Sequence, residues 1–209
     1  GEKITGEDIK TDTGTDILDK EAKKLGIELV AIRSNFTDTV FSENTEAEFT
    51  RFYDKLRQTD TLPVSSQPSP AEFLELFEDA KEKEEEVVVI TISSKLSGTY
   101  NGAMLAKDMA EYDNIYVVDS LLASLSERLL VEYAVKLRDA GMGAKELVRK
   151  LEQDRERVIL TGVPSTLLYL KMGGRISPVV AAVGGVIGIK PVLWLKDGVI
   201  ESRSKARGM

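Results

Sequence analysis

Hydroxyl side chains gather in one short segment of the sequence, ITISSKLSGTYNGA, at residues 90–103. The segment opens as an apolar, β-branched run and closes as a predicted helix, so the hydroxyls lie on a strand-to-helix turn. Ser93, Ser94 and Ser97 are therefore candidate ligand-binding residues. Backbone N–H groups and the positive end of the helix dipole favour an anion at such a turn, and hydroxyls add further donors. We expect this turn to bind an anionic group.

Two residues of this turn also have a simpler explanation. Ser97 is placed to cap the helix that begins near Gly98, although a cap explains one serine and not three. Lys95 either pairs with the anion or points into solvent. The sequence leaves both assignments open.

A second hydroxyl-rich turn, PVSSQPSP, occupies residues 63–70. Ser69 is predicted to cap a helix, because Pro70 follows it and Glu72 completes a capping box. Ser65 and Ser66 have no evident helical role. They remain candidates for binding a ligand.

The chain contains neither His nor Cys. These residues therefore cannot form a Ser-His-Asp triad, a Cys-His pair or a Cys/His zinc site. A metal-dependent enzyme acting on a small phosphorylated metabolite stays open, with Asp12, Asp16 and Asp119 as Mg²⁺ ligands at strand ends. The same aspartates are also typical of turns and helix caps. An interaction domain without a small ligand is a third possibility, which the clustered hydroxyls disfavour.

Bulk properties exclude other classes. The net charge of -7 argues against nucleic-acid binding, which needs a basic face. No stretch approaches the roughly 20 apolar residues of a membrane span, so we expect no membrane insertion. The polar first ten residues carry no visible secretory signal, and we expect a cytoplasmic protein.

Strands and helices must position these turns, and the two alternate along the chain. The pattern predicts an α/β domain at residues 1–164, with a mostly parallel sheet and flanking helices. The carboxyl ends of its strands should bring the polar turns at 11–16, 93–99 and 119–120 to one edge. Strands are predicted near 8–10, 27–32, 87–92, 115–120 and 158–164, and helices near 45–57, 69–86, 98–111, 122–140 and 144–155, with an earlier helix ending at Gly26.

Residues 165–209 do not continue the alternation of strands and helices seen in the first domain. They predict a short helix broken by a double glycine, a small apolar segment at 178–189, and a hairpin at 190–206 around Asp197-Gly198. We interpret them as the start of a second α/β domain with antiparallel strands. A lone hairpin is marginally stable, so we expect this domain to be incomplete here or completed by another chain.

Five further segments occur together with IKTDTGTDI near the N-terminus: SSQPSPAEF, ISSKLSGTYNGA, VVDS, LYLKMGGRIS and IKPVLWLKDG. With these motifs in this order, the chain resembles the DegV family of bacterial fatty-acid-binding proteins over residues 9–209. The resemblance implies a non-catalytic, two-domain α/β carrier that encloses one acyl chain, such as palmitate or another C14–C18 fatty acid, between its domains. Family members continue for several tens of residues past the position of Met209, which implies a truncated second domain.

The resemblance also implies roles for particular residues. The fatty-acid carboxylate is expected at Ser65, where the family usually has Thr, and at a serine among Ser93, Ser94 and Ser97. Some members present the fatty acid to a kinase that forms acyl-phosphate. In those proteins the arginine of the GGRIS motif faces the kinase, which corresponds to Arg175 here, and Arg207 matches a second basic position.

The physical chemistry of a fatty acid fits these expectations. Burying a C16 tail at ~0.8 kcal/mol per CH₂ supplies on the order of 10 kcal/mol. A buried carboxylate costs several kcal/mol unless donors satisfy it, and the hydroxyl turns offer donors. The small and branched residues at 178–189 suit either an acyl slot or an ordinary packed core.

Overall fold

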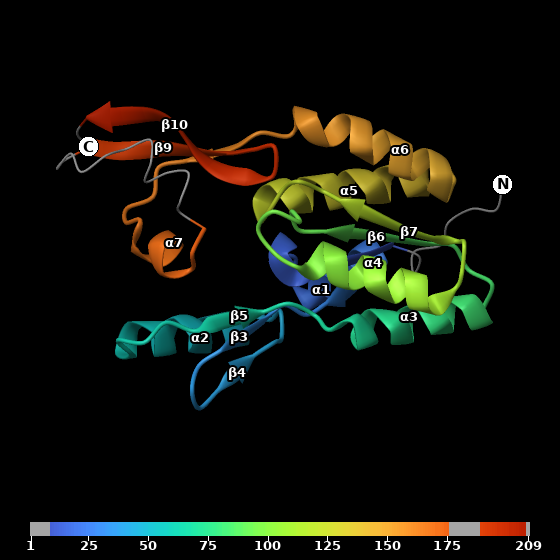
Figure 1. Cartoon of the computed structure of the whole chain (residues 1–209), viewed down its shortest axis with the longest axis horizontal. Helices are drawn as coiled ribbons and strands as arrows, with labels where there is room; N and C mark the ends of the chain where they lie inside the picture. The colour runs from blue at the N-terminus through green and yellow to red at the C-terminus, as the bar shows by residue number, and fades with distance from the viewer. Residues whose placement is uncertain (1–8, 176–188, 208–209) are drawn as a thin grey trace.

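A parallel sheet lies at the centre of the fold, as predicted. The computed structural model describes residues 9–175 and 189–207 (Figure 1). Four strands pair in the order β2-β1-β6-β7, and every pair is parallel. The turns that follow β1, β6 and β7 therefore meet at one edge of the sheet. The strands are β1 Ile9–Asp12, β2 Glu28–Val30, β6 Val87–Thr91 and β7 Ile115–Asp119.

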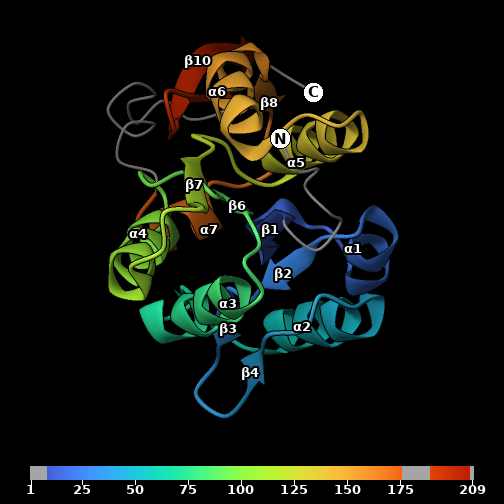
Figure 2. The same ribbon diagram turned by 90° about the vertical axis from the view of Figure 1, so that its right-hand side faces the viewer.

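Helices cover both faces of this sheet (Figure 2). Helices α1, α5 and α6 pack on one face, and α3 and α4 pack on the other. Alternate residues of β6 serve the two cores: Val88 and Ile90 join the first, and Val87 and Val89 join the second. Burial on both faces explains why β6 is apolar throughout. The helices are α1 Asp19–Leu25, α3 Pro70–Glu82, α4 Thr99–Ala110, α5 Leu125–Asp139 and α6 Ala144–Asp154.

Helix α3 begins at the predicted capping box. The Ser69 hydroxyl accepts a hydrogen bond from the Glu72 N–H at 3.3 Å, and the Glu72 carboxylate accepts one from the Ser69 N–H at 2.9 Å. Glu72 also pairs with Arg33 at 2.6 Å. That guanidinium lowers the pKa of Glu72 to about 2. The box therefore fixes the position of α3 relative to strand β3 (Arg33–Asn35).

A second, antiparallel sheet was not predicted. Its short strands run in the order β4-β3-β5, with β4 at Val40–Phe41 and β5 at Val64–Ser66. Helix α2 (Glu46–Gln58) packs beside them, and we call this unit the β3–β5 arm (residues 33–66). Three rings join its helix to its strands with centroids 5.5 to 5.8 Å apart, namely Phe36, Phe41 and Phe52.

A third, antiparallel sheet contains the strand that was predicted at 158–164 as part of the parallel sheet. Strand β8 (Leu160–Gly162) pairs antiparallel with β9 (Ile189–Lys196), which pairs with β10 (Val199–Arg207). Placing 158–164 in the parallel sheet was wrong, because an apolar run predicts a strand but not its partner. The hairpin was also wrongly expected to have no strand to join. Strand β8 thus pairs across the predicted boundary after residue 164.

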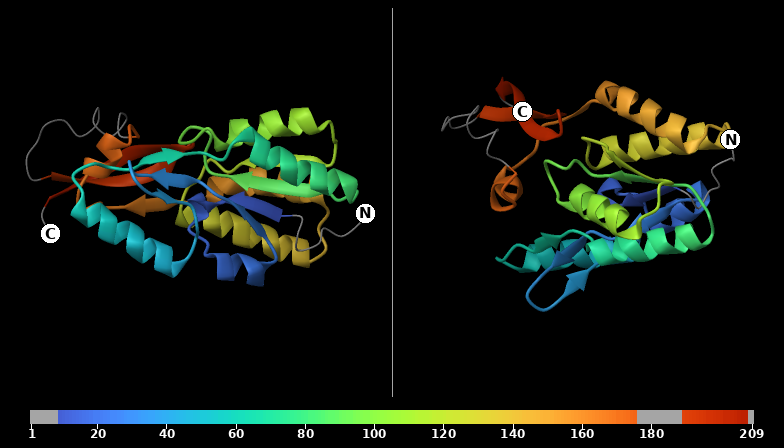
Figure 3. Two further views of the ribbon diagram at one scale, coloured as in Figure 1. Left: turned by 90° about the horizontal axis from the view of Figure 1, so that it is seen from below. Right: turned by 45° about the vertical axis from the view of Figure 1, so that its right-hand side comes forward.

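Helix α7 (Leu168–Met172) is the predicted short helix before the double glycine. It lies between the β3–β5 arm and the β9–β10 hairpin in Figure 1 and in the right-hand view of Figure 3. We call β8, α7, β9 and β10 the hairpin arm. Apart from Ile189, the apolar segment predicted at 178–189 lies outside the described residues. Among the residues described, no helix is long and apolar enough to cross a membrane.

Candidate functional site

The two hydroxyl-rich turns lie against each other. A β-carbon on Gly98 would sit 2.0 Å from Oε1 of Gln67, so the Gln67 side chain rests directly on the Gly98 backbone. Any larger residue at position 98 would push the Gln67 side chain away from this contact. Through this contact, the turn that carries Ser65 is joined to the turn that carries Ser97. The sequence had suggested no role for Gln67.

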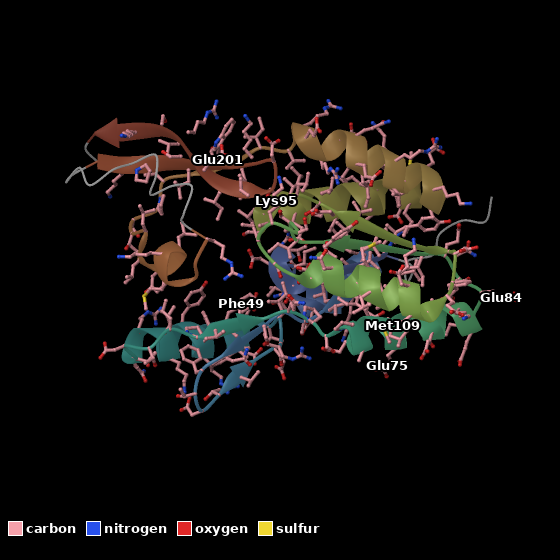
Figure 4. The ribbon with its side chains drawn as sticks, in the orientation of Figure 1. Phe49, Glu75, Glu84, Lys95, Met109 and Glu201 are labelled. Atoms are coloured by element: carbon pink, nitrogen blue, oxygen red, sulfur yellow. The ribbon has the colours of Figure 1, made fainter. Side chains whose placement is uncertain are left out.

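One cavity gathers several of the predicted residues. It has a volume of about 390 Å³, and its lining includes Ser94, Ser97, Lys95 and Arg175. Figure 4 shows Lys95 where the hairpin arm meets the helices of the parallel sheet. The N-terminus of α4 follows directly, so a helix dipole and two cationic side chains favour an anion here.

Ser97 bonds within its own turn. Its oxygen accepts a hydrogen bond from the Thr99 N–H at 3.3 Å and lies 2.9 Å from the Thr99 hydroxyl. The N-cap position of α4 belongs to Gly98, which has no side chain to cap it. The alternative in which Ser97 is the N-cap is therefore off by one position, although Ser97 still accepts from an N–H of the first turn.

Ser93 makes a structural contact. It is fully buried, and its hydroxyl donates to the Gly198 carbonyl at 2.7 Å. The Lys95 ammonium donates to the neighbouring Asp197 carbonyl, also at 2.7 Å. These two bonds tie the hydroxyl turn to the tip of the β9–β10 hairpin.

Arg175 is exposed, and its guanidinium lies across the hydroxyl turn. Nη2 and Nε donate to the Leu96 carbonyl at 3.1 and 3.2 Å, and Nη1 donates to the Gly173 carbonyl at 2.5 Å. Arg207 ends β10 opposite Ile189. Val199, which lines the same cavity as Arg175, begins that strand. At the usual rise per residue, the two ends of β10 are about 26 Å apart.

Ser65 faces a different cavity. This cavity has a volume of about 570 Å³ and lies between the β3–β5 arm and α7. Tyr53, Tyr169 and Met172 line it and are each more than half exposed. Gly173 also lines it, while the next two residues line the cavity of Ser97. The linings of the two cavities are therefore adjacent along the chain at the end of α7. Other apolar side chains of the lining are Phe52, Leu56, Leu62 and Pro63.

The three aspartates proposed as metal ligands bond to nearby turns. The carboxylate of Asp12 accepts from two backbone N–H groups, Asp119 Oδ1 accepts from two, and Asp16 accepts from the Ser124 hydroxyl. Burial raises the pKa of Asp12 to about 7. No group of three or more Asp or Glu side chains in the described residues is arranged to bind a metal. The turn-forming interpretation of these residues fits the structure.

Comparison with known proteins identifies the family. A family model described as "Uncharacterised protein, DegV family" matches residues 8–209. The chain belongs to the DegV family. A DegV domain-containing protein of Caldanaerobacter subterraneus subsp. tengcongensis is 33% identical over 200 residues, covering 96% of this chain and 71% of the relative.

Solved DegV structures share the fold. A fatty-acid-binding DegV family protein of Thermus thermophilus matches with a TM-score of 0.85 at 33% identity, covering 99% of this chain and 72% of that one. The fatty acid kinase B3 protein of Streptococcus pneumoniae, loaded with linoleic acid, matches with a TM-score of 0.78 at 29% identity. That match covers 96% of this chain and 72% of the other.

Sequence reasoning on this DegV chain missed part of the site. Gln67 packs on Gly98, and Tyr169 and Met172 line the cavity of Ser65. Arg175 was predicted to contact a partner, but its place in the cavity of Ser94 was not. The large side chains that precede the SSQPS and GGRIS motifs give no sign that α7 faces α2, because that contact depends on tertiary structure. The positive φ of Gly174, +74°, marks the turn that the double glycine did predict.

Proposed function

We propose that this protein binds one long-chain fatty acid. Its carboxylate binds where the two hydroxyl turns meet, near Ser94, Ser97 and Ser65. The acyl chain enters the apolar cavity between α7 and the β3–β5 arm. The observation that carries this proposal is that the linings of two cavities are adjacent along the chain at the end of α7. One lining includes hydroxyls and cations, and the other includes exposed apolar side chains.

The free energies favour such a ligand. Tyr53, Tyr169 and Met172 line one cavity and are each more than half exposed, and exposed apolar side chains gathered in one place are typical of a binding site. A C16 chain buried there gains on the order of 10 kcal/mol. At the other end, Lys95 and Arg175 lie close enough to the hydroxyl turn to attract a carboxylate in a protein whose net charge is -7.

The contacts of the four serines show which of their hydroxyls are available to bind the carboxylate. Ser94 and Ser97 line the cavity. The hydroxyl hydrogen of Ser93 already bonds to Gly198, so Ser93 acts in holding the turn. Ser65 is exposed on β5 and supplies a donor from the other turn.

The protein acts as a carrier and presents its fatty acid to a kinase that forms acyl-phosphate. The likeness to the fatty acid kinase B3 protein supports this role. Arg175 is exposed at the mouth of the cavity, where a kinase approaching the carboxylate would meet it. Arg207 is proposed as a second contact, on the hairpin arm.

Mass spectrometry of an organic extract tests the binding proposal. The purified protein should release fatty acids of C14–C18 in about equimolar amount. A protein that carries none, and that binds no added palmitate after delipidation, would overturn the proposal. Metal-dependent release of phosphate from a phosphorylated metabolite would instead support an enzyme.

Arg175→Ala tests the kinase role separately. Because Arg175 also lines the head-group cavity, the variant is tested at saturating palmitate, where it should be loaded with palmitate but fail to support its phosphorylation by a cognate kinase. Lys171→Ala, which removes an exposed cation of α7, is the matched control and should support phosphorylation at the wild-type rate. Phosphorylation at the wild-type rate with Arg175→Ala would show that Arg175 does not contact the kinase.

A further inference from the structure

The hydroxyl turn follows strand β6, and an aspartate at the end of each strand beside β6 bonds to it. Strands β1 and β7 flank β6 in the sheet and end at Asp12 and Asp119. Asp12 Oδ2 accepts from the Ile92 N–H at 2.7 Å, and Asp119 Oδ1 accepts from the Ser94 N–H at 3.1 Å. The N–H groups of Ile92 and Ser94, two residues apart, are thus bound by carboxylates that come from opposite sides of β6.

Each aspartate also holds the turn of its own strand. Asp12 Oδ1 accepts from the Gly14 N–H at 2.8 Å, and Asp119 Oδ1 accepts from the Leu121 N–H at 3.1 Å. Carboxylate bonds to backbone N–H groups are stronger than neutral ones and fix the direction of the peptide. Three turns at the edge of the sheet are therefore joined through two side chains.

We propose that Asp12 and Asp119 are positioning residues of the head-group site, which hold the hydroxyls of Ser94 and Ser97 in the orientation that receives a fatty-acid carboxylate. This inference rests on the proposed function. A positioning role is assigned to both because Asp12 is 1% exposed, and because each side chain accepts a hydrogen bond from the backbone of the hydroxyl turn. They act through the peptide that carries the serines.

The arrangement also specifies how the head group is recognised. Because the Ser94 N–H is bonded to Asp119, it is withdrawn from the ligand. Recognition then depends on hydroxyls, with Lys95 and Arg175 nearby, rather than on the backbone of the turn. A ligand without a carboxylate should gain nothing from this geometry.

The test compares palmitate with methyl palmitate. The ester keeps the acyl chain but loses the charge, so the ratio of the two dissociation constants isolates the head group. In Asp119→Ala we expect that ratio to fall about tenfold, as for the loss of one charged hydrogen bond. Asp119→Asn should recover most of the ratio, because an amide oxygen can still accept at Oδ1.

Asp12 should respond differently to the same substitution. Both of its oxygens accept from N–H groups, so at a pH above its pKa of about 7 Asp12→Asn would place an NH₂ group against a backbone N–H. The ratio should fall in Asp12→Asn as far as in Asp119→Ala. Asp16→Ala is the control: its carboxylate bonds to the Ser124 hydroxyl and not to the hydroxyl turn, and the ratio should not change.

The outcomes separate this inference from the function on which it rests. If the wild-type protein binds neither ligand, the proposed function fails. If it binds palmitate and Asp119→Ala keeps the wild-type ratio, or weakens both ligands equally, the positioning role is wrong. Should Asp12→Asn not fold, the pair of substitutions at Asp119 decides the result.

Discussion

Ser93 and Ser97 belong to one turn but make different contacts, and alanine substitution should separate them. The Ser93 hydroxyl donates to Gly198, whereas Ser97 lines the cavity. Ser97→Ala should weaken palmitate binding about 10- to 100-fold, because a hydrogen bond to a charged group is worth roughly 1.5–3 kcal/mol. Ser93→Ala should instead lower the free energy of unfolding by about 1–3 kcal/mol, because the buried Gly198 carbonyl loses its donor.

Isothermal titration with palmitate and urea denaturation measure the two effects. Ser42→Ala removes an exposed hydroxyl outside both turns and serves as the control. Wild-type affinity in Ser97→Ala would show that the carboxylate binds elsewhere.

Glu127 predicts how stability depends on pH. It is fully buried, and neither carboxylate oxygen has a hydrogen-bond partner among the described residues. Burial raises its pKa well above the usual value, and the nearby charges of Asp12, Asp16 and Asp119 add to this. Burial likewise raises the pKa of Asp12 from 3.8 to about 7. Between about pH 4 and pH 7 the folded state therefore keeps protons that the unfolded state has released.

It follows that these two groups lower the free energy of unfolding as the pH rises through this window. Glu127→Gln removes one of the titrations and keeps the shape of the protonated acid. Relative to wild type, the variant should gain stability from pH 5 to pH 8, as urea denaturation at each pH would reveal. A difference between variant and wild type that does not change with pH would mean that Glu127 titrates normally.

At the scale of elements, the tip of the β9–β10 hairpin depends on Gly198. Its φ is +82°, and a β-carbon there would lie 2.6 Å from the Ser93 hydroxyl oxygen. Gly198→Ala should cost at least about 1 kcal/mol for the left-handed backbone alone, and more for the clash. Gly162→Ala in β8 is the control, because a β-carbon there meets nothing within 4 Å. Equal melting temperatures for the two variants would show that the tip does not dock on Ser93.

The elements that the sequence predicted well are those with local signals. Ser69 and Glu72 define the start of α3, and the apolar run of β6 defines a strand covered on both faces. Strands β3 to β5 have two or three residues each, too few to show a period. Strand β8 and the β9–β10 hairpin were both predicted, but their pairing was not, because β9 follows β8 much later in the chain.

The candidate site likewise contains residues that the sequence marks locally and contacts that only the fold reveals. Strand-to-helix turns rich in hydroxyls mark Ser94 and Ser97 without a structure. The contacts that fix them join distant positions, as Asp12 does with Ile92 and Gln67 with Gly98. No periodicity carries such information, so these residues could be assigned only from the fold.

At the scale of the whole molecule, helix α7 lies between the β3–β5 arm and the β9–β10 hairpin, as Figure 1 and the right-hand view of Figure 3 show. Its residues line the cavity of Ser65, and its packing partners include Leu193 of β9. A helix this short has little stability of its own. Its order should therefore depend on what fills the cavity.

Hydrogen exchange of delipidated protein, with and without palmitate, tests this dependence. At a palmitate concentration 100 times the dissociation constant, binding stabilises the folded state by about 2.7 kcal/mol. We expect the amides of Lys171, Gly173 and Arg175, which bond within and just after α7, to gain protection together with those of β5. Amides of the buried strand β6 exchange only on global unfolding and report the overall stabilisation. Methyl palmitate should also order α7, but it should leave the hydroxyl turn as it is without ligand. Protection that rises equally in β6 and α7 on addition of palmitate would mean that palmitate does not order α7.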